Sequence, residues 1–197
     1  VREGFVFENV SFHYPNREDW VLREVSFQLG PREKLALVGE NGVGKTTLVK
    51  LLTRLYDPSE GRILLDGKDL RDYDLSQLRH AVGVIFQDFV RYHLNASENI
   101  AVGRIEALDD HQRIVEAARR SLAERVIERL PDGYQQRIGR WFRQGTNLSG
   151  GEWQKIALAR AYMRDAELLI LDEPTAALDA RAEHQIFSRF VELTQGK

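Results

Sequence analysis

Residues 39–47 read Gly-Glu-Asn-Gly-Val-Gly-Lys-Thr-Thr, and the run from Gly39 to Thr46 satisfies the pattern GxxxxGK[ST]. Glycines at these places let a loop turn its backbone N–H groups inward around phosphate oxygens. An apolar run, Lys34–Val38, precedes the loop and predicts a buried parallel strand, and Thr47–Leu55 follows it with helical spacing. A strand, a glycine loop and a helix in this order predict a phosphate-binding unit, because the helix directs its positive dipole end at the anion.

The loop itself contains the first set of candidate binding residues. Lys45 can supply a cation to the β- and γ-phosphates, and Thr46 can offer its hydroxyl to Mg²⁺. The candidate nucleotide-binding residues of this stretch are Gly39, Asn41, Gly42, Val43, Gly44, Lys45, Thr46 and Thr47.

The composition is that of an ordinary globular domain with room for an inserted part, at 197 residues, 43% of them hydrophobic and 29% charged. The formal net charge of −2 indicates no basic surface for nucleic acid, so we expect no nucleic-acid partner. The absence of cysteine excludes disulfides and thiol chemistry. No apolar run approaches the roughly 20 residues that cross a bilayer, so we expect a soluble chain.

Five further runs predict strands, and two stretches predict helices. The strand patterns are Phe5–Tyr14, Val21–Leu29, Gly61–Leu65, Val82–Phe86 and the buried run Leu168–Asp172. The helical patterns are residues 97–130, in which Val115, Ala118, Leu122, Val126 and Leu130 share one spacing, and Glu152–Met163. The middle of the chain is therefore predicted to be a helical insert.

Two carboxylates, Asp172 and Glu173, end the last strand pattern. A carboxylate at the C-terminal end of a parallel strand beside a phosphate loop can hold Mg²⁺, and its neighbour can orient or deprotonate an attacking water. An Asp-Glu-Pro at a strand end can also be a plain polar turn. The phosphate loop earlier in the chain favours the metal role for Asp172.

The stretch Leu148–Glu152 reads Leu-Ser-Gly-Gly-Glu just before a helix. Ser149 followed three residues later by Glu152 predicts a capping box, which is a structural feature and needs no ligand. Two glycines behind a serine at a helix N-terminus can also receive an anion, so the two interpretations are compatible.

Together these motifs resemble those of the ATP-binding cassette (ABC) ATPases, the nucleotide-binding domains of ABC transporters. Gly39–Thr47 looks like the Walker A loop, Leu168–Pro174 like the Walker B strand, and Leu148–Glu152 like the family signature. Ala177–Asp179 looks like the D-loop, and Gln87 sits where the family has its Q-loop glutamine. The match covers most of the chain, and the signature is specific to this family.

The resemblance implies an α/β fold: a P-loop NTPase with a RecA-like core, an N-terminal antiparallel β subdomain and an inserted α-helical subdomain. We expect residues 1–87 to form the nucleotide-binding core with the β subdomain. Residues 88–157 would form the helical subdomain with the signature, and residues 158–197 would return to the core, which is incomplete at the C-terminus.

The resemblance also implies a head-to-tail dimer that closes on two ATP molecules with Mg²⁺. Catalytic roles fall to Glu173, Gln87 and Lys45, and Mg²⁺ would be held by Thr46, Gln87 and Asp172. The opposing subunit would contribute Ser149, Gly150, Gly151 and Glu152 to the same nucleotide. Little covalent work is left for the protein, because phosphoryl transfer depends mainly on positioning and electrostatic stabilisation.

Three aromatic residues have weaker signals. Tyr14 lies where the family stacks an aromatic ring on adenine, although a plain strand-end aromatic has the same pattern. Trp141 and Trp153 are interpreted as packing residues or surface anchors.

The chain departs from the family pattern in two places. It ends before the switch histidine of the family, and His184 lies too close to Asp179 to replace it. We therefore expect a truncated cassette that holds Mg-ATP and hydrolyses it poorly. The segment Ile138–Asn147 resembles the one with which exporters touch their membrane domains, but it is longer and more basic.

The function implied is the ATP-binding and ATP-hydrolysing part of an ABC transporter, an exporter at the cytoplasmic face of the cell membrane. Its partners would be a transmembrane domain fused upstream and a second nucleotide-binding domain. The alternative is a soluble ABC ATPase of DNA repair or translation. The stretch between Gln87 and Ser149 is too short for the long coiled coil of a repair ATPase, and Glu173 disfavours a scaffold that binds without turnover.

Overall fold

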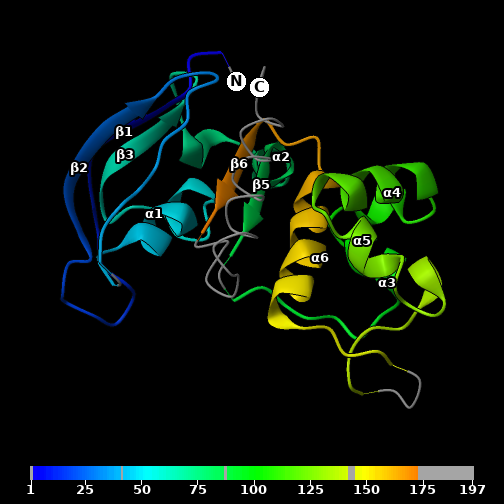
Figure 1. Ribbon diagram of the computed structural model, residues 1–197. Helices are drawn as coiled ribbons and strands as arrows, with labels where there is room; N and C mark the ends of the chain where they lie inside the picture. The colour runs from blue at the N-terminus through cyan, green and yellow to red at the C-terminus, as the bar shows by residue number, and fades with distance from the viewer. Residues whose placement is uncertain (1, 41, 87, 142–144, 173–197) are drawn as a thin grey trace. The chain divides into compact units, whose positions relative to one another are not determined.

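The computed structural model describes residues 2–40, 42–86, 88–141 and 145–172 (Figure 1). These residues form two compact units, one of residues 2–82 and a second that begins at Gly83. The three-part division at residues 87 and 157 stays a prediction. None of the described helices has the length and apolar character needed to span a bilayer.

The first unit is built on a four-stranded antiparallel sheet with the strand order β2-β1-β3-β4. Its strands are β1 (Phe5–Phe12), β2 (Leu22–Leu29), β3 (Glu60–Leu65) and β4 (Lys68–Asp69). Three of them confirm predicted strands. The two-residue strand β4 is too short to have a sequence pattern.

The register of this sheet follows from the alternation in β1. Phe7 lies opposite Phe27 on one side and opposite Ile63 on the other. The rings of Phe7 and Phe27 stack with centroids 4.3 Å apart, and Phe7 and Ile63 are almost fully buried. Because side chains alternate along a strand, this apolar set fixes which face of β1 is covered.

Two helices and one short 3₁₀ turn complete the first unit. They are α1 (Lys45–Leu52), η1 (Leu70–Asp72) and α2 (Leu75–Ala81). Helix α1 buries Leu48, Leu51 and Leu52, as the predicted apolar spacing requires, but it ends at Leu52 and not at Leu55, which is 47% exposed. The side chain of Asp74 caps α2 by accepting a hydrogen bond from the Gln77 N–H.

The predicted strand Lys34–Val38 is wrong. The structure shows no strand there, and Leu35, Leu37 and Val38 are 49%, 40% and 93% exposed. A buried parallel strand needs a hydrogen-bonded neighbour on its sheet. Neither sheet formed by the described residues includes this run.

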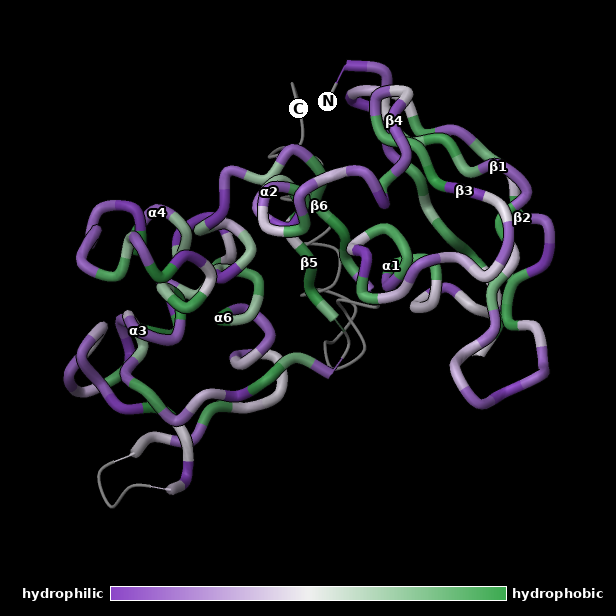
Figure 2. The backbone as a smooth tube through the Cα atoms, turned by 180° about the vertical axis from the view of Figure 1, so that it is seen from behind, coloured by the Kyte–Doolittle hydropathy of each residue, from purple (hydrophilic) through white to green (hydrophobic). Residues whose placement is uncertain are grey.

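The second unit combines a short sheet with a group of helices (Figure 2). Its two strands, β5 (Val82–Ile85) and β6 (Leu168–Leu171), pair with each other. Its helices are α3 (Ala96–Ala101), η2 (Ile105–Ala107), α4 (His111–Arg120), α5 (Glu124–Ile127), η3 (Gly133–Gln135) and α6 (Gly150–Tyr162).

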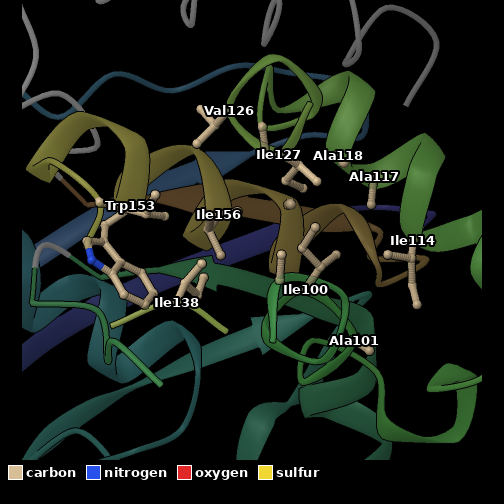
Figure 3. Packing of buried hydrophobic residues seen from close by; sticks show 14 of the residues in the cluster. Ile100, Ala101, Ile114, Ala117, Ala118, Val126, Ile127, Ile138, Trp153 and Ile156 are labelled. Atoms are coloured by element: carbon tan, nitrogen blue, oxygen red, sulfur yellow. The ribbon is translucent and has the colours of Figure 1, made fainter. Parts of the chain in front are cut away.

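Helix α6 is central to the packing of this unit, as Figure 3 shows for Trp153 and Ile156. These side chains meet Ile100 from α3, Ala118 from α4 and Ile127 from α5 in one buried cluster. Trp153 is 2% exposed. Its predicted role in packing is therefore confirmed, and the core of the unit holds α6 against three other helices.

The helical pattern of residues 97–130 is only partly confirmed. Helix α4 ends at Arg120, and Leu122 has a left-handed backbone with φ +62°. A left-handed residue cannot continue a right-handed helix, so the spacing from Val115 to Leu130 runs through two separate helices. The strand β6 is half-buried along its length, where the pattern Leu168–Asp172 predicted a buried strand.

Candidate nucleotide-binding site

The glycine loop enters α1 through a backbone shape that only glycine adopts easily. Gly44 caps the helix with φ +103°, and a Cβ there would lie 2.9 Å from Leu22 Cδ2 and 3.3 Å from the Val21 carbonyl oxygen. Gly42 also has a positive φ, of +85°. The loop therefore needs glycine at Gly44 for two reasons, its backbone angle and the close approach of β2.

The ammonium of Lys45 folds back over the loop. It donates hydrogen bonds to the carbonyl oxygens of Gly39 at 2.8 Å and Glu40 at 3.0 Å. The carbonyls hold the cation above the loop, next to the N-terminus of α1. A phosphate at this helix end would find the positive end of the helix dipole and the ammonium together.

Tyr14 lies beside the first turn of α1. Its hydroxyl forms a 3.0 Å hydrogen bond with Thr47 Oγ1, and Lys50 Nζ donates to it at 3.3 Å. Its ring packs edge-on against Phe12 and Tyr56. Thr47 is buried and therefore turned away from solvent, while Thr46 is half-buried. The structure thus brings Tyr14 to the loop, and stacking on adenine stays a prediction.

Asp172 follows β6 in the second unit and is 5% exposed. Its N–H donates to the Ile85 carbonyl oxygen at 2.9 Å, which extends the pairing of β6 with β5. Its Oδ2 atom is buried and has no hydrogen-bond partner among the residues that the structure describes. Burying an unpaired carboxylate oxygen is costly, and a cation would satisfy it. The buried carboxylate oxygen of Asp172 therefore fits the role of a Mg²⁺ ligand.

Ser149 and Glu152 form the predicted capping box at the start of α6. The Ser149 N–H and hydroxyl both donate to Glu152 Oε2 at 2.9 Å, and the Glu152 N–H donates to Ser149 Oγ at 3.3 Å. The Ser149 N–H contributes most to holding the pKa of Glu152 below its ordinary value. The Ser149 hydroxyl and Arg129 add to this effect, which outweighs the opposing effect of burial.

Arg160 on α6 is a half-buried cation that the sequence analysis missed. It donates to the backbone carbonyl of Asn99 at 3.0 Å, to Asn99 Oδ1 at 2.9 Å and to the Val90 carbonyl. Its guanidinium also lies 4.8 Å from the Tyr92 ring centroid. Burial lowers its pKa to about 10. Arg160 therefore ties the signature helix to residues 90–99, and no pattern in the sequence marks this contact.

Several predicted residues lie outside the described part of the chain. These are Asn41, Gln87, Glu173, the Ala177–Asp179 segment and His184. Lys45 and Thr46 belong to the first unit, whereas Ser149 and Asp172 belong to the second. The structure therefore shows the local surroundings of each of these four residues separately.

A family model described as "ABC transporter" matches residues 22–176. The chain belongs to the ABC transporter family. It is 42% identical over 192 residues to the subtilin transport ATP-binding protein SpaT of Bacillus subtilis, with 98% of this chain and 31% of SpaT covered. It is 44% identical over 191 residues to an ATP-dependent lipid A-core flippase of Alkalilimnicola ehrlichii, with 97% of this chain and 32% of the flippase covered.

A solved structure of a bacterial Atm1-family ABC exporter with ATP bound matches this ABC chain with a TM-score of 0.88 at 38% identity. The match covers 98% of this chain and 33% of the exporter. The chain thus spans about a third of the length of the relatives it matches. The expected α/β fold of a P-loop ABC ATPase is confirmed, and as a member of this family the chain binds ATP.

Proposed function

We propose that this ABC chain is the ATP-hydrolysing part of an exporter in which a transmembrane domain belongs to the same protein. The observation that carries the proposal is a group of matches that cover nearly all of this chain to proteins named as exporters. One is a putative multidrug export ATP-binding/permease protein of Bacillus subtilis, 43% identical over 94% of this chain and covered over 31% of its own length. The remaining two thirds of such a relative leave room for a membrane domain.

In this proposal, Lys45 and the Gly39–Thr47 loop bind the phosphates of ATP. The ammonium exchanges the carbonyls of Gly39 and Glu40 for phosphate oxygens, which carry full charge and make stronger hydrogen bonds. Tyr14 stacks on the adenine. The phosphate loop therefore positions the nucleotide, which is the main task in phosphoryl transfer.

Thr46, Gln87 and Asp172 hold Mg²⁺, which supplies neutralisation of the charge that develops on the phosphates. The buried and unpaired Asp172 Oδ2 supports this role. Glu173 accepts a proton from the attacking water, and Gln87 orients that water. Lys45 stabilises the transferred phosphoryl group electrostatically.

The signature residues act on ATP bound by a second copy. Ser149 begins α6 with its hydroxyl exposed, and the N–H groups of Gly150 and Gly151 lie in the first helical turn, where no intrahelical partner exists. These donors can receive the terminal phosphate. Two copies would thus close head to tail on two nucleotides.

The segment around Trp141 is proposed to face the membrane domain at the cytoplasmic side of the membrane. The Trp141 side chain is 83% exposed and stacks on the His93 ring at 4.8 Å. Large exposed aromatic side chains are enriched at protein interfaces. Residues 88–157 would be the subdomain that carries this contact, between core parts at residues 1–87 and 158–197.

The proposal is tested by Mg-ATP-dependent association of the complete protein that carries this chain. Light scattering or crosslinking should show pairing of the nucleotide-binding domains with Mg-ATP and none with Mg-ADP. ATP hydrolysis should be lost on Glu173→Gln while association is strengthened, because the nucleotide stays intact. Hydrolysis without any ATP-dependent pairing would contradict the shared site.

A further inference from the structure

The hydrogen-bonding capacity of Ser149 is already used by Glu152. A serine hydroxyl has one proton to donate. In the structure that proton goes to Glu152 Oε2 at 2.9 Å, and the Ser149 N–H goes to the same oxygen. A phosphate that needs the Ser149 hydroxyl must first displace the carboxylate.

The group to be displaced is an anion. Neighbouring donors hold the pKa of Glu152 below its ordinary value, so the carboxylate is ionised at neutral pH. It is only 26% exposed, which limits screening by water. Two anions that share one donor repel each other, and they do so more strongly at a partly buried site than in bulk water.

Arg129 offers the carboxylate a second position. Its Nη2 donates to Glu152 Oε1 at 2.8 Å, while its Nε donates to the Arg125 carbonyl oxygen at 3.0 Å. The backbone carbonyl anchors the guanidinium just after α5. Glu152 thus has one oxygen on Ser149 and the other on the guanidinium of Arg129, which is 67% exposed, and a small rotation can move the carboxylate from the first partner toward the second.

We propose that Glu152 competes with the terminal phosphate of ATP for the Ser149 hydroxyl, and that Arg129 draws the carboxylate aside when the phosphate arrives. The inference rests on the proposed function, in which Ser149 meets ATP bound by a second copy. Glu152 then inhibits pairing of the two copies, because it raises the ATP concentration that pairing needs. Arg129 relieves this inhibition in part.

The first test is Glu152→Gln in the complete protein. Glutamine keeps the capping box and removes the charge, so the melting temperature should stay within about 2 °C. Half-maximal pairing with a slowly hydrolysed ATP analogue and Mg²⁺ should need about tenfold less nucleotide, which corresponds to about 1.4 kcal/mol. The KM for ATP should fall by a similar factor. An unchanged or higher half-maximal concentration overturns the proposal.

The second test is Arg129→Gln, which leaves the capping box intact. It should raise the half-maximal nucleotide concentration about threefold, and it should have no effect when Glu152→Gln is also present. Equal effects in both backgrounds would show that Arg129 contacts phosphate directly, and would overturn the proposal. If Glu152→Gln lowers the melting temperature by more than about 2 °C, the result for Arg129→Gln alone decides between the outcomes. The rise in half-maximal nucleotide concentration predicted for Arg129→Gln requires the charged carboxylate of Glu152 as a competitor.

The matched control is Glu116→Gln on α4, where the carboxylate also pairs with exposed arginines, Arg119 and Arg120. It should leave pairing unchanged. The two levels of inference fail differently. Absence of ATP-dependent pairing in the unmodified protein refutes the shared site of the proposed function. If the unmodified protein pairs normally and Glu152→Gln does not strengthen that pairing, only the inhibitory role of Glu152 is refuted.

Discussion

Gly44 meets two structural demands that can be separated by experiment. Gly44→Ala places a Cβ at φ +103° and 2.9 Å from Leu22 Cδ2, whereas Gly42→Ala meets no atom within 4 Å at φ +85°. The shared backbone strain costs about 1–2 kcal/mol in both variants. Because of overpacking, we expect the free energy of unfolding of Gly44→Ala to fall by about 1 kcal/mol more than that of Gly42→Ala, as measured by urea unfolding. Equal losses of unfolding free energy in the two variants would contradict the close approach of Leu22 to Gly44.

Asp172 should make nucleotide binding depend on Mg²⁺. Asp172→Asn keeps the side-chain volume and removes the charge, so the gain in ATP affinity that Mg²⁺ brings should fall at least about tenfold, as a lost charged ligand implies. A fluorescent ATP analogue titrated in Mg²⁺ and in EDTA measures this ratio. Asp165→Asn is the control, because that carboxylate is 76% exposed and pairs with Arg104 and Arg113. An unchanged ratio in Asp172→Asn would exclude Asp172 as a ligand.

Residue types and their spacing were sufficient to predict the capping box, while the roles of the loop residues stay a prediction. The pattern of Ser149 and Glu152 specifies its own hydrogen bonds locally, so the structure confirms it. Arg129 and Arg160 could not be predicted, because each acts on a partner far along the chain. A charged residue in a helix pattern gives no sign that the fold will bury it.

At the scale of helices and strands, Arg160 determines how firmly α6 is joined to residues 90–99. Arg160→Lys keeps the charge but cannot reach Asn99 and the Val90 carbonyl together. Urea unfolding should show a loss of about 2–3 kcal/mol, since hydrogen bonds from a half-buried charged group are worth more than neutral ones. Arg164→Lys is the control two residues after the end of α6, where an exposed guanidinium donates to the Gly103 carbonyl oxygen, and it should change stability by less than about 0.5 kcal/mol. A small effect of Arg160→Lys would mean that the apolar cluster alone holds α6.

Strand prediction succeeded where the pattern included an obvious partner. The alternating residues of β1 and β2 pair with each other, with register shifts on either side of Val10, and both predicted strands are confirmed. The run Lys34–Val38 has the same apolar character, but apolar character says nothing about which strand will supply the hydrogen bonds. Helix α3 illustrates the opposite case, because its capping box of Asn95 and Glu98 was a readable signal that the sequence analysis did not use.

At the scale of the whole molecule, the proposed division of the site between two copies predicts complementation. Lys45→Ala and Ser149→Ala should each be inactive in ATP hydrolysis when every site is defective. If Lys45 of one copy and Ser149 of the other share a site, as proposed, each mixed dimer contains one site with both residues intact. An equal mixture should recover about a quarter of the unmodified activity, since half of the dimers are mixed and each has one intact site of two. No recovery at any mixing ratio would contradict shared sites.

The two compact units also explain why the site could be predicted only in pieces. The loop runs into α1, Asp172 follows β6 and Ser149 caps α6, as their motifs predicted, whereas the strand predicted ahead of the loop is not there. Lys45 lies in one unit and Asp172 in the other. Each motif specifies only its own element, so no local pattern in the sequence sets the distance between these two residues.

The exposed run Leu35–Val38 has a consequence for anyone who purifies the chain. Its apolar side chains are exposed and its backbone lies outside both sheets formed by the described residues, and exposed apolar segments of this kind promote aggregation. Concentrated samples should therefore lose monodispersity in storage. Replacing Val38, which is 93% exposed, by lysine should slow that aggregation by adding a charge to the segment.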